Sequence, residues 1–354
     1  MPHLRLRSAE RRRPGARCAR ALAWCVAGAL LLSAGAHGAD RADLAASPAL
    51  PTTPLPSDVA GWIARVQQAA LERSYTGTFV VTTDSGASIG SRIWHACQGE
   101  QHIERIETLD GPPRTIFRRN GQMRTFLHGT HTAVMESLGS TAPFSSAVPA
   151  LASKLDLLYR AVQQGSGRVA GHEADVVLLQ PRDDLRFGYR LWSERRSGLV
   201  LRMQTVQADG RVREQASFLQ LDLDAPVSLA ALSRAMDDLS GYRALAVVPE
   251  RTVQDAERSW VLREPVPGFA LQGCRVPQVR PQTMQCSYSD GLASVSLFFE
   301  PTPAGKTVPV VARWSAGATQ ALARPLDATT WLTAVGEVPA ATLVLFAERL
   351  VRAR

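Results

Sequence analysis

The chain has 354 residues and a formal net charge of +8 at pH 7. Residues 1–38 hold seven arginines and one glutamate, so removing this +6 from +8 leaves only +2 for the rest of the chain. A nearly neutral remainder argues against a nucleic-acid partner. The remaining 316 residues are too many for one ordinary hydrophobic core, so two domains are expected.

Residues 1–38 have the features of an export signal. A basic stretch ends at Arg20, an apolar run follows over residues 21–32, and Ala36-His37-Gly38 is a small-x-small cleavage site. The apolar run is too short for a comfortable membrane span. We therefore expect Sec-type export, cleavage near Gly38-Ala39 and a periplasmic protein. Residues 39–56, rich in Pro, Ala and Thr, are expected to form a flexible leader.

Residues 75–127 carry the strand pattern around which the chain is organised. Their β-branched and aromatic residues suit a half-buried pleated surface. Asn120-Gly121 between two such runs predicts a type I′ hairpin. Apolar residues fall on both faces, so this sheet must be covered on both sides or wrap around something apolar. Strands are expected at residues 76–83, 89–97, 101–109, 114–119 and 122–127.

Two amphipathic helices are expected beside these strands. The first covers residues 57–73 with Ser57 as N-cap, and the second covers residues 149–164, ended by Gly165-Ser166-Gly167. Residues 131–149 are expected to be irregular. Four further strands are expected, the last two joined by Asp209-Gly210 as a second type I′ turn. They cover residues 174–181, 186–193, 199–207 and 211–221.

The predicted fold is mainly β with some α. So large a twisted antiparallel sheet tends to curl, which predicts an unclosed β-barrel over residues 57–224 with the two helices as lids. Residues 225–256 are expected to be a linker with a helical pattern at 228–239. Residues 257–354 predict a smaller α+β domain. Its strands are expected near residues 293–300, 307–314 and 331–335, and its final helix at 339–352 with Pro339 at the first helical position.

Three cysteines follow the export signal. An oxidising compartment favours a disulfide between Cys274 and Cys286, with two buried free thiols as the alternative. The closed loop would stabilise a small, loop-rich domain. Cys97 is then unpaired, and we expect it to be a small buried residue within a strand.

The sequence contains no convincing catalytic or metal-binding set. Ser88 lies in a G-x-S-x-G pattern, but a strand pattern follows where a nucleophile elbow needs a helix, so a hairpin turn is expected. His95, Cys97 and His102 lack a second closely spaced pair of metal ligands. Glu104 and Glu107 lie among arginines and are expected to form cross-strand charge pairs. We therefore expect no enzyme activity, no cofactor and no metal.

Eight short segments, in this order, resemble the RseB/MucB family of periplasmic regulators of sigma-E (AlgU-type) sigma factors. The resemblance covers residues 57–354 and is weakest over residues 130–149. The segments are YTGTFV at 75–80, ERIE at 104–107, LDGPPR at 109–114, RVAG at 168–171, QPRD at 180–183, FGYRLW at 187–192, PGF at 267–269 and YSDGL at 288–292.

This resemblance implies an open barrel similar to the lipoprotein carriers LolA and LolB, a smaller C-terminal domain and a tendency to form homodimers. It also implies binding to the periplasmic part of a membrane-spanning anti-sigma factor of the RseA/MucA kind. Binding would shield that segment from proteolysis until a lipid or lipopolysaccharide fragment releases it. A periplasmic lipid or lipoprotein carrier of the LolA type is the alternative, and a hydrolase using Ser88 a remote third possibility.

Two sets of residues follow as candidates for these functions. Strand alternation and helix periodicity predict an acyl-chain cavity, although a one-residue shift in register would move its strand residues to the other face. Open sheet edges and aromatic residues predict that the second domain supplies most of the anti-sigma contact. The cavity residues are Phe79, Val81, Ile93, Ile116, Phe126, Trp62 and Leu155, and the partner-binding residues are Trp260, Tyr288 and Trp314.

Overall fold

The computed structural model describes residues 55–99, 101–137, 152–246, 251–254, 257–276, 282–302 and 311–353. The export signal, nearly all of the leader and the first residues of the second expected helix lie outside these ranges. Within them, no helix is long and apolar enough to cross a membrane.

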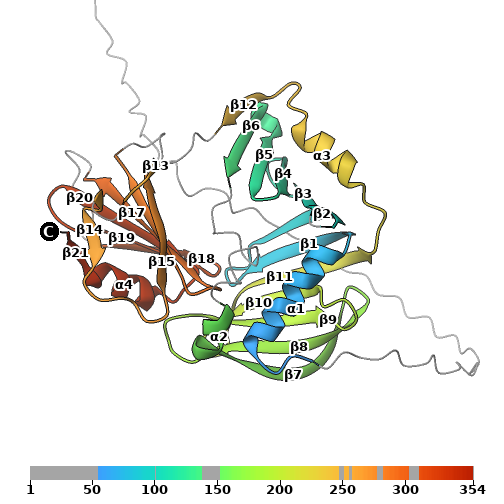
Figure 1. Cartoon of the computed structure of the whole chain (residues 1–354), viewed down its shortest axis with the longest axis horizontal. Coiled ribbons are helices and arrows are strands. Elements are labelled where there is room, and N and C mark those ends of the chain that lie inside the picture. The colour runs from blue at the N-terminus through green and yellow to red at the C-terminus, as the bar shows by residue number, and fades with distance from the viewer. Residues whose placement is uncertain are drawn as a thin grey trace, which may run out of the picture. The chain divides into compact units, whose positions relative to one another are not determined.

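A twelve-stranded sheet forms the first part of the fold, in the order β12-β6-β5-β4-β3-β2-β1-β11-β10-β9-β8-β7 (Figure 1). Its strand order has two ends and is not closed. Neighbouring strands are antiparallel, apart from the parallel pair β12 and β6. The expected mainly β fold with an unclosed sheet is therefore confirmed. The strands are β1 (Tyr75–Thr83), β2 (Ser88–Gln98), β3 (Gln101–Thr108), β4 (Arg114–Arg119), β5 (Gln122–Leu127), β6 (Thr132–Ser137), β7 (Tyr159–Val169), β8 (His172–Pro181), β9 (Gly188–Glu194), β10 (Val200–Val206), β11 (Val212–Leu223) and β12 (Arg243–Ala246).

The two expected type I′ turns have different outcomes. Asn120 and Gly121 both have positive φ, of 48° and 78°, as that turn requires. At Asp209-Gly210 only the glycine has a positive φ. The Gln207 N–H donates to the Arg211 carbonyl, next to a register shift at Val206. The second prediction is wrong, because a longer loop with an adjoining bulge joins β10 and β11.

The two helices predicted from periodicity both occur, with corrected ends. Helix α1 (Val59–Glu72) is capped by Asp58, whose carboxylate accepts from the Gly61 N–H, and not by Ser57. Helix α2 (Ala152–Leu158) ends early, and β7 follows at once. The prediction of helix over residues 159–164 is wrong because this stretch pairs with β8, and sheet pairing overrides local periodicity.

The stretch expected to be irregular contains a strand. After the 3-10 turn η1 (His128–Thr130), β6 pairs with β5 and extends the sheet by one strand. The expected linker also contributes to this sheet. Its helix α3 (Leu229–Asp237) packs on the first strands, the Arg119 guanidinium pairs with the Asp237 carboxylate, and β12 pairs with β6.

Cross-strand register assigns the covering helices to opposite faces of the sheet. Tyr75 and Ile93 pack with Ala69 of α1, whereas Phe117 and Phe126 pack with α3. We call these sides the α1 face and the α3 face. Helix α2 lies on the α1 face, where Leu155 shares a buried cluster with Trp62. The sheet therefore buries side chains on both of its faces, as the apolar residues on both faces of the predicted strands indicate.

A seven-stranded sheet in the order β13-β15-β16-β17-β20-β19-β18 forms the second part, with β14 and β21 as a separate pair. Strand β19, the β14–β21 pair and the strands that carry the two cysteines were not predicted, and residues 307–310 of the strand expected at 307–314 lie outside the described ranges. Helix α4 (Ala340–Arg349) begins after Pro339, which is its N-cap and not its first residue. It ends before residue 350 because β21 pairs with β14. The strands are β13 (Arg251–Thr252), β14 (Trp260–Leu262), β15 (Ala270–Val276), β16 (Met284–Ser289), β17 (Ser294–Pro301), β18 (Ala312–Ala316), β19 (Thr319–Pro325), β20 (Thr330–Gly336) and β21 (Leu350–Arg352).

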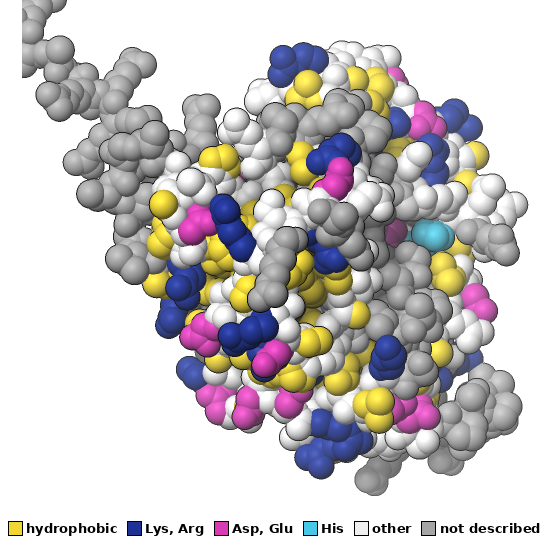
Figure 2. Space-filling model, turned by 60° about the vertical axis from the view of Figure 1, so that its left-hand side comes forward, with side chains coloured by type: hydrophobic (Ala, Val, Ile, Leu, Met, Phe, Trp, Pro, Cys, Tyr) yellow, Lys and Arg dark blue, Asp and Glu magenta, His cyan; other side chains and the backbone are white. Residues whose placement is uncertain are grey.

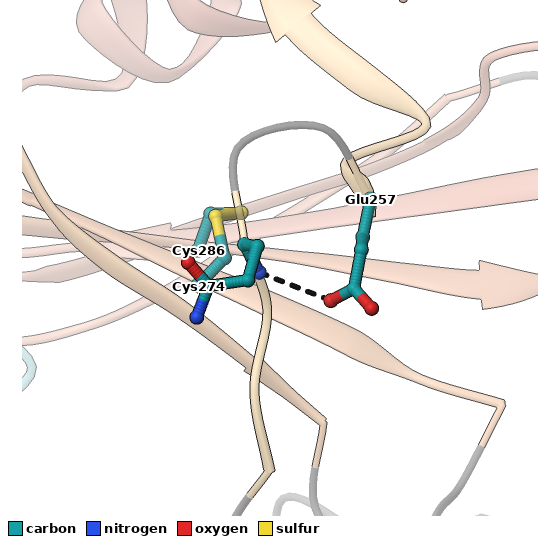
Figure 3. Close-up of a disulfide and its surroundings, with 4 residues drawn as sticks. Glu257, Cys274 and Cys286 are labelled. Carbon is teal, nitrogen blue, oxygen red and sulfur yellow. Dashed lines mark hydrogen bonds between the residues drawn. A yellow bond between two sulfur atoms is a disulfide. The ribbon is translucent and has the colours of Figure 1, made fainter.

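The predicted disulfide joins Cys274 of β15 to Cys286 of β16, directly opposite each other in the register (Figure 3). Both residues are buried in the second core. Cys97 is free and only half-buried, with its sulfur 3.7 Å from the Ser74 hydroxyl. Cys97 therefore lies in a strand, β2, as expected, but the expectation that it is buried is wrong.

Candidate ligand-binding and partner-binding surfaces

Four of the predicted cavity residues lie together on the α1 face. Phe79 and Val81 project there from β1, and Ile93 and Ile116 from β2 and β4, because residues paired across antiparallel strands share a face. Ile93 is buried, but the other three are only half-buried. This part of the sheet therefore offers a row of apolar side chains that the described helices do not fully cover.

Trp62 and Leu155 lie on the same face but over the other half of the sheet. Both are fully buried against a cluster that includes Tyr159, Leu179 and Leu191. Their surface is already used in helix–sheet packing. A ligand would reach them only if α1 or α2 moved.

Phe126 belongs to the opposite side of the sheet. Its ring packs edge-on against Phe117 at 5.7 Å and Tyr242 at 5.0 Å, beneath Leu232 and Met236 of α3. It cannot share a lining with Phe79, so its assignment to the same cavity is wrong. The alternation of residues 122–127 gave no indication of which face would be covered by which helix.

A buried polar group interrupts the α1 face. The His95 ring stacks on Tyr75 at 4.9 Å, and its Nδ1 lies 3.5 Å from a Glu104 carboxylate oxygen. Burial, followed by the charge of Glu104, raises the pKa of Tyr75. Burial also acts to raise the pKa of Glu104, but the His95 contact and the Arg118 charge outweigh it, so that pKa is lowered. Within the described ranges, no three His, Cys, Asp or Glu side chains are arranged to hold a metal ion.

The Ser88 turn and one of the charge pairs agree with the sequence analysis. Glu104 and Arg118 face each other across β3 and β4, 3.6 Å apart. Glu107 pairs with Arg105 on the same strand, β3, so this pair is not the cross-strand pair that was expected. Ser88 begins β2 directly after a hairpin turn, with its hydroxyl 3.0 Å from that of Thr82. A strand therefore follows Ser88, as predicted, and the geometry of a nucleophile elbow is not formed.

Of the three predicted partner-binding aromatics, only Trp314 is at the surface. Trp260 is 9% exposed and Tyr288 7%, and both belong to the second core, where the Tyr288 ring lies 5.1 Å from Phe346. The expectation that these two anchor a partner is corrected by their burial. Trp314 is 45% exposed on β18, the end strand of its sheet. On the side drawn in Figure 2, hydrophobic side chains reach the surface among basic and acidic side chains.

A buried ion pair that sequence reasoning missed joins the two sheets. The Arg186 and Asp290 side chains are both 0% exposed, with Nη1 and Oδ2 2.5 Å apart. Arg186 also donates to both Asp183 carboxylate oxygens, at 2.8 and 3.1 Å, and to the Pro267 carbonyl at 2.8 Å. Its position beside a strand pattern gives no sign of burial, because the enclosing residues come from a distant part of the chain.

Both carboxylate oxygens of Asp290 are hydrogen-bonded, like the guanidinium of Arg186. Its Oδ2 also accepts from the Tyr159 hydroxyl at 3.0 Å, and its Oδ1 accepts from the Leu292 and Ala293 N–H groups at 2.8 and 2.7 Å. Burial raises the pKa of Asp290, and the Arg186 guanidinium and these donors oppose that rise. The group is therefore a buried but fully hydrogen-bonded junction.

A second junction lies near β18. The Ala318 N–H approaches a Glu214 carboxylate oxygen at 3.5 Å, and Arg213 donates to the Gly317 carbonyl at 3.3 Å. A further bond lies beside the first junction, where the Thr342 hydroxyl of α4 donates to the carbonyl of Leu185, the neighbour of Arg186, at 2.8 Å. Burial raises the pKa of Glu214, against the weak bond from Ala318.

Comparisons with known proteins match both parts of the chain. A family model described as the MucB/RseB N-terminal domain matches residues 58–236, and one described as the MucB/RseB C-terminal domain matches residues 254–351. The sigma factor AlgU regulatory protein MucB of Pseudomonas aeruginosa is 30% identical over 295 residues, which cover 81% of this chain and 88% of MucB.

Solved structures give the same result. MucB in the Pseudomonas aeruginosa MucA/MucB complex has a TM-score of 0.65 and 27% identity, covering 83% of this chain and 99% of that chain. MucB in complex with MucA(peri) has a TM-score of 0.63 at 27% identity, over 84% and 100% of the two chains. The sigma-E factor regulatory protein RseB of Haemophilus influenzae is 26% identical, over 66% of this chain and 73% of that protein.

Proposed function

Because the chain belongs to the MucB/RseB family of sigma-factor regulatory proteins, we propose that it is a periplasmic negative regulator of an envelope-stress sigma factor. It binds the periplasmic part of a membrane-spanning anti-sigma factor and shields that segment from regulated proteolysis. A lipid or lipopolysaccharide-type molecule releases it. The observation that carries this proposal is the match of both family domains, in order, to the two parts of the fold.

The partner is inferred from the relatives. MucB has been solved in complex with MucA(peri), and that MucB resembles this chain over nearly its whole length. On this chain, β18 supports a contact in the second domain, since it ends its sheet and carries the exposed Trp314. An end strand can add an extended peptide through backbone hydrogen bonds, and an exposed tryptophan can anchor it.

The lipid signal is inferred from the α1 face. The half-buried side chains of Phe79, Val81 and Ile116 supply apolar surface on the face that α1 covers, and α1 in turn contacts α2. Each buried methylene contributes about 0.8 kcal/mol, so a chain of about ten carbons would compete with modest helix packing.

The test measures binding of residues 39–354 to the periplasmic segment of the anti-sigma factor from the same organism, by calorimetry and by protection of that segment from its protease. Trp314→Ala should weaken binding about tenfold or more, as expected for a central aromatic anchor. Leu219→Ala removes an exposed side chain from β11 and is the matched control. Full-strength binding by Trp314→Ala would show that the contact lies elsewhere on the protein. Absence of binding by the unaltered protein would refute the proposal.

A periplasmic lipid or lipoprotein carrier is the second candidate, favoured by the same half-buried row on the α1 face. A carrier would transfer labelled lipid between vesicle populations without any anti-sigma segment. Transfer together with failure to bind that segment would favour the carrier. Homodimer formation remains a prediction that sedimentation equilibrium would test.

A further inference from the structure

Tyr159 connects a lid helix to the second sheet. It is the first residue of β7 and directly follows Leu158, the last residue of α2. Its ring is fully buried in the cluster with Trp62 and Leu155 on the α1 face. Its hydroxyl leaves that cluster and donates to Asp290 in the turn between β16 and β17.

The two lid helices are tied to each other and to this tyrosine. The Val59 N–H at the start of α1 donates to the Asp156 carboxylate of α2 at 2.8 Å. Arg182 donates from Nε to the carbonyls of Asp156 and Tyr159, at 3.0 and 3.1 Å. A displacement of either helix is therefore transmitted to Tyr159 by these hydrogen bonds, because no flexible linker separates Tyr159 from α2.

The second sheet contributes a close-fitting counterpart. Leu292 packs against the first-sheet cluster, and Leu185 packs against the second core. Gly268 has a φ of +80°, and a Cβ there would lie 2.8 Å from both Arg186 Nη2 and Leu158 Cδ2. The junction thus depends on the position of the last residue of α2 as well as on the buried ion pair.

We propose that Tyr159, Asp290 and Arg186 form a latch that couples the lid helices of the first domain to the docking of the second. An acyl chain that displaces α2 withdraws the Tyr159 hydroxyl from Asp290. The ion pair then lacks one of its hydrogen bonds, and the second domain loosens. The consequence for anti-sigma binding rests on the function proposed above.

Thermodynamic linkage makes this latch measurable. A ligand shifts the docked state only by as much as its affinity differs between docked and loosened forms. The factor by which an amphiphile weakens binding of the anti-sigma segment must equal the factor by which the segment weakens binding of the amphiphile. We expect this factor to be about tenfold, within the usual range for coupled sites.

Tyr159→Phe is the decisive variant because it removes only the hydroxyl that reaches Asp290. Tyr189→Phe is its matched control. Tyr189 lies in the same cluster, 6.2 Å from the Tyr159 ring, and within the described residues its buried hydroxyl has no hydrogen-bond partner. The probe is a synthetic short-chain lipid A analogue, titrated below its micelle concentration.

In Tyr159→Phe the coupling factor should fall to within about twofold of unity, while each ligand alone still binds. In Tyr189→Phe it should equal that of the unaltered protein. If the coupling factor of Tyr159→Phe equals that of Tyr189→Phe, the latch is refuted while the proposed function stands. Failure of the unaltered protein to bind the anti-sigma segment overturns the proposed function and with it the coupling.

Amide hydrogen exchange tests the latch without either ligand. Asp290→Asn and Tyr159→Phe should both speed exchange of the Leu292 and Ala293 N–H groups, which bond to Asp290, by about tenfold relative to Tyr189→Phe. Unchanged exchange in Tyr159→Phe would show that its hydroxyl does not hold this turn. That result overturns the latch even if the anti-sigma segment binds normally.

Discussion

The two sheets bury their apolar residues to different degrees. On the α1 face of the first sheet, Phe79, Val81 and Ile116 remain half-buried, and the same face carries the buried ring of His95, whose nitrogens have no hydrogen-bond partner within the described residues. In the second, α4 covers a face on which Leu297 and Leu332 are fully buried. The first sheet therefore has the features of an adaptable binding surface, and the second those of a rigid platform.

The junction between the two sheets is as fully buried as the core of the second sheet. Arg186 and Asp290 are as buried as any core residue, yet their charged atoms are hydrogen-bonded. Breaking such a pair is expected to disturb the fold more than altering the half-buried face of the first sheet.

Arg186→Met should have the largest effect. It leaves the Asp290 carboxylate buried without its cation, which costs about 3–5 kcal/mol of unfolding free energy. Denaturant unfolding at pH 7 measures this, and Arg190→Met, which removes contacts to two glutamine side chains, is the control. A loss below about 1 kcal/mol would mean that the junction contributes no more than a surface ion pair.

Phe346→Ala against Phe79→Ala compares the two regions directly. Phe346 is fully buried under the second sheet, so its truncation should cost about 3–5 kcal/mol. Phe79 is half-buried and already meets solvent, so its loss should cost roughly 1–2 kcal/mol. Equal costs in denaturant unfolding would contradict the view that the first sheet is less tightly packed.

Cys274→Ala with Cys286→Ala tests whether the disulfide contributes to the rigidity of the second sheet. Removing the bond that closes this short loop should lower the unfolding free energy by about 2–4 kcal/mol. Thiol labelling of the denatured, unreduced protein should modify Cys97 alone. Rapid labelling of all three cysteines would show that the bond does not form in the exported protein.

Glu214→Gln should give the smallest effect. Burial raises the pKa of Glu214, and burial together with the charge of Glu214 raises that of Glu337. A carboxyl with a raised pKa in the folded state favours folding at low pH, and this contribution is lost as pH rises through the folded pKa. The unfolding free energy should therefore fall less between acid and neutral pH in Glu214→Gln than in the unaltered protein, by a difference of less than about 1 kcal/mol. An unchanged pH profile would exclude Glu214 as its source.

Local sequence determined much of the secondary structure for identifiable physical reasons. Asn120-Gly121 specified its hairpin because both residues tolerate positive φ. Cys274 and Cys286 were predicted to pair from chain composition and export alone, and the register places them opposite each other. Trp62 was correctly assigned to the apolar face of a helix, since helical periodicity depends only on neighbours along the chain.

Tertiary structure decided what these local patterns leave open. Tyr159 fits a helical stripe as well as a strand, and pairing with β8 chose the strand. Phe126 alternates correctly, yet only the position of α3 determined which face it occupies. The sequence predicted that Trp260, Tyr288 and Trp314 were aromatic anchors, whereas packing against α4 and its neighbours buried two of them. Arg186 and Asp290 are 104 residues apart, and no local pattern records a contact that exists only when two sheets meet.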